Sequence, residues 1–122
     1  MVLCTNLKIF NNIILRKERM MMKPSMVIVS PKVYVVQEAR GRNLIPATNY
    51  GTIEVLLPPG NVAFSSFPTV RRLNDKLRNF SDKDYLLLMG DPAAIAMAGA
   101  IAANNNRGNM KLLKWDKQET SY

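Results

Sequence analysis

Apolar residues recur along the chain with two different periods, and the alternation between those periods outlines the fold. Four short runs have the length and largely apolar character of strands: 33–36, 53–57, 85–89 and 111–115. The run 33–36 is apolar on both faces, which suits a strand that is covered on both sides. Apolar residues at helical spacing indicate one helix over about 68–80, and a run of small apolar residues indicates a second over 92–104. Because strand and helix patterns alternate, they predict βαβ units built on a parallel sheet.

The stretch from Tyr85 to Trp115 carries the clearest of these units. Its first strand closes at Gly90, and Asp91-Pro92 then has the composition of a helix start. An Asp at the N-cap accepts main-chain N–H groups, and the fixed φ of Pro suits the first helical position. Asn and Gly residues after Ala103 end the helix before the next strand. We therefore predict an α/β fold, a three-layer domain with a small, mostly parallel sheet and βαβ crossovers.

Residues 1–22 differ in pattern from the rest of the chain. Their apolar run is short and is interrupted by Asn11-Asn12, so it does not resemble a secretory signal. The basic run 16–19 directly before Met20-Met21-Met22 resembles a translated ribosome-binding site, which indicates a mis-annotated start. The alternatives are a disordered extension or a short helix that docks a partner. We therefore divide the chain into a doubtful leader, 1–22, and a single α/β domain, 23–122.

The charge balance favours anionic partners. Seventeen Lys and Arg residues against nine Asp and Glu residues give a formal net charge of +8. The candidate basic residues lie in a long polar loop over 38–51 and on the helix over 68–80: Arg40, Arg42, Arg71, Arg72, Lys76 and Arg78. Charge on the outer side of an amphipathic helix also serves simply to face water, so a binding role and a solvation role both remain open.

Residues suited to catalysis are few. The chain has no His and a single cysteine, Cys4, which excludes internal disulfides, His-based acid–base chemistry and Cys/His zinc sites. Asp82, Asp84 and Asp91 bracket one predicted strand from opposite ends, so we do not expect them to converge. Asp91 places a negative charge at its helix start, where glycine-rich phosphate motifs are absent, so an N-cap role is favoured over a phosphate site. We therefore predict no enzyme, no cofactor and no metal.

The apolar helix over 92–104 suggests two further interpretations. Gly90-Asp91-Pro92 divides the nearly uncharged stretch around it into pieces too short to span a bilayer, so we predict no membrane role. Small apolar residues on every side of the helix favour a covered position. We therefore expect a homo-oligomer or a tight complex with a partner.

Four segments together resemble a known group of viral proteins: Ser30–Gln37, Arg40–Leu44, Tyr85–Ala96 and Met110–Gln118. Over about residues 26–122 the chain resembles small proteins of tailed bacteriophages that carry no established activity, particularly phages of marine bacteria and cyanobacteria. The resemblance implies expression in the host cytoplasm. It transfers no functional residues.

Two functional hypotheses follow from size, charge and resemblance. The first is a non-enzymatic phage interaction or regulatory protein that binds a host or phage macromolecule, with a protein as the expected partner. The alternative is a nucleic-acid- or nucleotide-binding protein that neutralises phosphates with the six basic residues.

Overall fold

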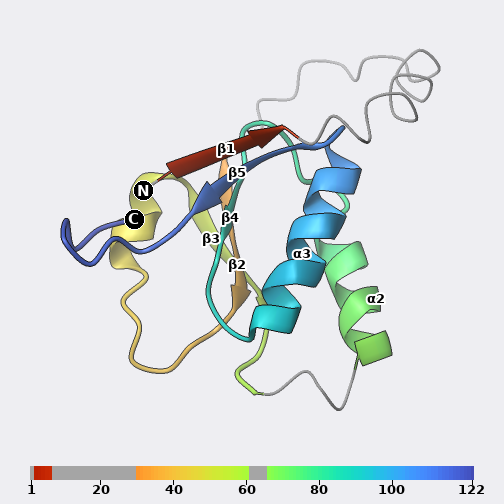
Figure 1. The fold of residues 1–122 in the computed structure, drawn as a ribbon, viewed down its shortest axis with the longest axis horizontal. Helices are drawn as coiled ribbons and strands as arrows, with labels where there is room; N and C mark the ends of the chain where they lie inside the picture. The colour runs from red at the N-terminus through yellow and green to blue at the C-terminus, as the bar shows by residue number, and fades with distance from the viewer. Residues whose placement is uncertain (1, 7–29, 61–65) are drawn as a thin grey trace.

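The computed structural model describes residues 2–6, 30–60 and 66–122, which form a five-stranded sheet with two α helices and a 3-10 helix (Figure 1). The strands are β1 (Val2–Asn6), β2 (Lys32–Gln37), β3 (Thr52–Leu57), β4 (Tyr85–Leu87) and β5 (Asn109–Leu113). Their order across the sheet is β1-β5-β4-β2-β3. Strands β5, β4, β2 and β3 are mutually parallel, and β1 pairs antiparallel with β5. The predicted α/β fold with a mostly parallel sheet is therefore confirmed.

Both α helices cover the same face of the sheet (Figure 1). They are α2 (Ser66–Lys76) and α3 (Pro92–Asn105). Leu73, Leu77 and Phe80 are buried beneath them, as the helical spacing predicted. Ala94, Ala98 and Ala102 of α3 are also fully buried. Because alanine side chains end at Cβ, they let α3 lie close to the sheet, which explains the small residues of this helix without a membrane.

In the described residues, the opposite face of the sheet is covered by a 3-10 helix and a tail instead of an α helix. The 3-10 helix η2 (Ile45–Asn49) and the C-terminal tail pack there against the buried side chains of the central strands. This second core contains Val33, Val35, Ala47, Leu87, Met89, Leu113 and Tyr122. The predicted third layer is therefore present, but it is built from a loop and a tail.

The strand order explains why the two α helices share a face. From β2 the chain moves outwards to β3, then returns past β2 to β4 and continues to β5. Parallel crossovers are right-handed in nearly all sheets. Right-handed connections that move in opposite directions across the sheet pass over opposite faces. The β2–β3 connection therefore lies on one face, and α2 and α3 lie on the other.

Three details differ from the sequence predictions. Helix α2 is shifted towards the N-terminus and ends at Lys76, where the chain continues as a turn. Residues 2–6 of the predicted leader form strand β1, which the sequence analysis did not predict, whereas residues 7–22 lie outside the described part of the chain. Strand β4 ends at Leu87 instead of residue 89, and strand β5 lies two residues earlier than predicted, at Asn109–Leu113 instead of 111–115.

Candidate functional site

The six basic candidates lie in two separate places on the structure. Arg40 and Arg42 belong to the loop between β2 and η2, on the side of the sheet that carries the tail. The other four lie on or directly after α2, on the helical side: Arg71, Arg72, Lys76 and Arg78. The sheet lies between the two groups, so they do not form one continuous binding surface (Figure 1).

Two of the four residues near α2 have local partners. The ammonium group of Lys76 donates a hydrogen bond to the main-chain oxygen of Val55 in β3 at 3.0 Å, and the side chain is half-buried. Arg78 forms an exposed ion pair with Asp75 at 3.3 Å. An exposed pair of this kind contributes less than about 1 kcal/mol to stability. These two residues therefore support the helix and its contact with the sheet.

Arg71 and Arg72 are exposed, and within the described residues neither guanidinium group has an acidic partner. Phe67 lies one helical turn before Arg71, and 78% of its surface is accessible to solvent. Residues four positions apart are neighbours on a helix surface, so Phe67 and Arg71 project from the same side of α2. We name the exposed residues Phe67, Pro68, Arg71 and Arg72 the outer face of α2.

Sequence reasoning missed the place of Phe67 because it started the helix at residue 68. In the structure α2 begins at Ser66, which puts Phe67 in its first turn. The spacing of four residues between Phe67 and Arg71 was the signal that could have found the pair.

Ligands of open α/β sheets usually bind beyond the carboxyl ends of two adjacent strands whose following connections run in opposite directions across the sheet. Here that position lies between β2 and β4, and the side chain of Gln37 fills it. Gln37 is 4% exposed; its amide donates to the main-chain oxygens of Pro58 at 3.0 Å and Gly60 at 2.6 Å. Its oxygen accepts from the main-chain N–H of Asp91 at 2.8 Å. The usual ligand position is therefore occupied by a side chain that ties three segments together.

Gly90 permits this close packing. Its φ is +112°, a conformation that L side chains rarely adopt, and a Cβ built on it would lie 2.4 Å from Cβ of Gln37. A glycine is therefore required at position 90, in the turn between β4 and α3, for two independent reasons.

The three aspartates near β4 have separate structural roles. Asp91 caps α3, because its carboxylate accepts the main-chain N–H of Ala93 at 2.8 Å, as predicted. Asp84 is 4% exposed and accepts from the main-chain N–H groups of Lys32 and Ser81, each at 2.9 Å. Asp82 pairs with Arg107 at 3.1 Å. Within the ranges that the structure describes, no three acidic or cysteine side chains gather as metal ligands would.

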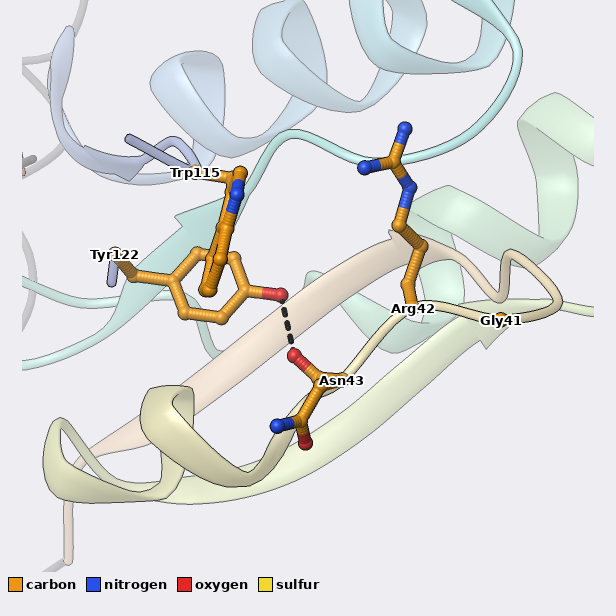
Figure 2. A pocket seen from close by; sticks show the side chains of 5 residues that line it. All are labelled: Gly41, Arg42, Asn43, Trp115 and Tyr122. Atoms are coloured by element: carbon orange, nitrogen blue, oxygen red, sulfur yellow. Dashed lines mark hydrogen bonds between the residues drawn. The ribbon is translucent and has the colours of Figure 1, made fainter. Parts of the chain in front are cut away.

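A cavity of about 200 Å³ lies between the loop after β2 and the tail (Figure 2). Its lining consists of Gly41, Arg42, Asn43, Trp115 and Tyr122. Figure 2 shows the indole of Trp115 and the guanidinium group of Arg42 on opposite sides of this space. Of the six basic candidates, Arg42 is the one that lines the cavity, and it is joined by two aromatic residues that the sequence analysis did not connect with it.

The electrostatics of the cavity involve Tyr122 directly. Burial raises the pKa of the Tyr122 hydroxyl above its ordinary value, and the nearby positive charge of Arg42 opposes that increase. The hydroxyl stays protonated at neutral pH and donates to the main-chain oxygen of Asn43 at 2.9 Å. Arg42 is therefore the charged group that the cavity offers to a ligand.

The fold and these surfaces define a small basic α/β protein, and within the described residues no helix has the length and apolar character needed to cross a membrane. The chain belongs to the Phage Pam3 gp32-like protein family, whose model matches residues 31–122. The resemblance to a small phage protein is thereby confirmed. No curated protein and no solved structure matches the chain.

Proposed function

We propose that this phage protein is a non-enzymatic interaction protein that acts in the host cytoplasm and binds an acidic surface of a host or phage protein through the outer face of α2. The observation that carries the proposal is the exposed ring of Phe67 on the same helix surface as two exposed arginines, which have no acidic partner in the described residues. Phe67 is more exposed than Ile45, the other large apolar side chain that lies mostly in solvent within the described residues.

The chemistry of the outer face of α2 matches that of protein interfaces. Aromatic and arginine side chains are enriched among the residues that contribute most to binding, whereas lysine is depleted. Phe67 would supply the apolar contact, while Arg71 and Arg72 would select an acidic partner and speed its association. The N-terminal turns of a packed helix present these groups on a rigid support.

Affinity purification from infected cells tests this proposal when three versions of the chain are compared. One is the wild type, one carries Arg71→Glu and Arg72→Glu, and the control carries Lys83→Glu and Lys117→Glu. All four substituted residues are exposed, and both variants change the net charge equally. We expect the wild type and the control to retain the same partner and the outer-face variant to lose it. Direct titration of the purified partner should then show the same order of affinities.

Equal recovery by the two variants would contradict the proposal. The same holds for a Phe67→Ala variant that binds the purified partner as tightly as the wild type, because an anchor residue at an interface costs at least about 1–2 kcal/mol when truncated.

The alternative function is nucleic-acid binding through the same helix. It is favoured by one observation, the absence of carboxylate partners for Arg71 and Arg72 within the described residues, which leaves both groups free to contact phosphates. Gel shifts at low salt test it. Binding of this kind weakens linearly with the logarithm of salt, with a slope of about −0.9 per duplex phosphate contact. Arg71→Ala with Arg72→Ala should flatten that slope for every sequence, and an unchanged slope would exclude the alternative.

A further inference from the structure

The cavity beside the tail combines groups that recognise a planar ring and an anion. Two aromatic side chains, Trp115 and Tyr122, line one part of it, and the Arg42 guanidinium lines another. No acidic side chain belongs to the lining. Aromatic rings of this kind stack on nucleobases, and arginine pairs with phosphate through two parallel hydrogen bonds.

The two aromatic side chains, Trp115 and Tyr122, are held in place in the absence of a ligand. Tyr122 is 5% exposed, and its ring meets that of Trp115 edge to face, with centroids 5.0 Å apart. The Tyr122 hydroxyl donates to Asn43, and the hydroxyl of Tyr50 donates to the main-chain oxygen of Tyr122 at 2.8 Å. These side chains therefore lose little conformational entropy when a ligand binds, which favours affinity in a small site.

The charged group of the cavity is left for a ligand. The Tyr122 hydroxyl is engaged with Asn43, whereas the Arg42 guanidinium is exposed and has no acidic partner in the described ranges. Figure 2 shows that this guanidinium reaches out from the loop, across the cavity from the Trp115 indole. A ligand between them would meet a ring on one side and a positive charge on the other.

We propose that this cavity binds a single nucleotide unit, with its base against Trp115 and its phosphate paired with Arg42. The site is distinct from the outer face of α2 and does not depend on the function proposed for that face. Its volume of about 200 Å³ is smaller than the pockets of about 300–1,000 Å³ that hold drug-sized ligands. One nucleotide unit, either free or at the end of a single strand, therefore fits the site better than a dinucleotide does.

The experiment follows the indole N–H resonance of Trp115 in two-dimensional NMR spectra, which is unique because the chain has one tryptophan. Adenosine monophosphate, adenosine and inorganic phosphate are titrated separately into the full chain. We expect adenosine monophosphate to shift the resonance in a saturable way at concentrations up to about 10 mM. Adenosine alone and phosphate alone should each bind at least about tenfold more weakly, because each lacks one of the two contacts.

Variants in the loop after β2 make the test specific. Arg42→Ala should weaken binding of adenosine monophosphate about tenfold, and Arg42→Lys should give an intermediate loss, because lysine keeps the charge without the two-pronged contact. Arg40→Ala is the matched control: Arg40 is exposed in the same loop but does not line the cavity, so affinity should be unchanged.

Short single-stranded oligonucleotides with and without a 5′ phosphate distinguish the two sources of the ligand. Tighter binding of the phosphorylated strand than of adenosine monophosphate assigns the site to strand ends, and the reverse order assigns it to free nucleotides. The proposal is overturned if adenosine monophosphate leaves the indole resonance unmoved, if adenosine binds equally well, or if Arg42→Ala and Arg40→Ala have equal effects.

Discussion

Replacing Gln37 by glutamate tests the central hydrogen-bond junction of the sheet with a minimal change in shape. The amide of Gln37 donates to Pro58 and Gly60 and accepts from the N–H of Asp91. A glutamate carboxylate can still accept from that N–H, but it has no proton for the two main-chain oxygens. Gln37→Glu therefore removes two hydrogen bonds and places a negative charge against two carbonyl groups in a buried position.

The size of the effect follows from these contacts. Each lost hydrogen bond is worth about 1 kcal/mol. A buried charge without a partner adds a further penalty, which brings the expected destabilisation to about 3–4 kcal/mol at neutral pH. Domains of this kind have a total unfolding free energy of about 5–15 kcal/mol, so the loss is a large fraction of it.

The destabilisation should decrease as the pH is lowered. The two carbonyl oxygens disfavour the carboxylate in the folded state and therefore raise the pKa of the introduced carboxyl above its unfolded value of about 4.3. As the pH falls through that raised pKa, the folded variant takes up a proton and regains one donor. About half of the stability difference from the wild type should then return.

Urea unfolding at several pH values, followed by far-ultraviolet circular dichroism, measures this difference. Gln118→Glu is the matched control, because Gln118 is exposed in the tail and the substitution adds the same charge. We expect the control to remain within about 0.5 kcal/mol of the wild type at every pH. A Gln37→Glu variant as stable as this control, or a stability difference that does not vary with pH, would refute the role assigned to Gln37.

Three other predictions concern single positions. Gly90→Ala should lower the unfolding free energy by at least about 2 kcal/mol, because the alanine would need a φ of +112° and its Cβ would lie 2.4 Å from Cβ of Gln37. A urea midpoint equal to that of the wild type would contradict the close packing. Burial raises the pKa of Tyr122, so the stability that its protonated form contributes is present below its unfolded pKa of about 10 and is lost as the pH rises through the folded value. Tyr122→Phe should reduce this alkaline loss in urea titrations, and an identical pH profile would show that burial does not control the hydroxyl. Ala96 is exposed on α3. If the exposed side of α3 joins two copies of the chain, Ala96→Arg should convert the oligomer to a monomer in sedimentation equilibrium. A wild type that is monomeric at all concentrations would contradict the expected homo-oligomer.

Local sequence patterns were sufficient to predict the elements of the fold. The run of three valines and one tyrosine at 33–36 is buried on both faces because a strand in the middle of a covered parallel sheet must be apolar throughout. Asp91-Pro92 marked the start of α3 because capping depends on residues one or two positions away. Features that depend on such short-range interactions can be predicted from the order of the residues alone.

The binding surfaces were only partly predictable from the sequence. The sequence indicated Arg71 and Arg72 as candidates, but grouped them with Arg40 and Arg42, which lie on the other side of the sheet. Side chains from neighbouring loops are brought together or separated by the direction of each crossover. That direction follows from the strand order, which no local pattern specifies.

Composition and periodicity alone determined that this chain forms a basic α/β domain with one amphipathic and one alanine-rich helix. The tertiary structure decided that Gln37 would fill the usual ligand position of the sheet, and that Arg42 would face Trp115 and Tyr122, more than seventy residues away in the chain. The physical reason is that a buried amide or a cavity lining is defined by partners distant in sequence. These become neighbours only when the chain closes its core.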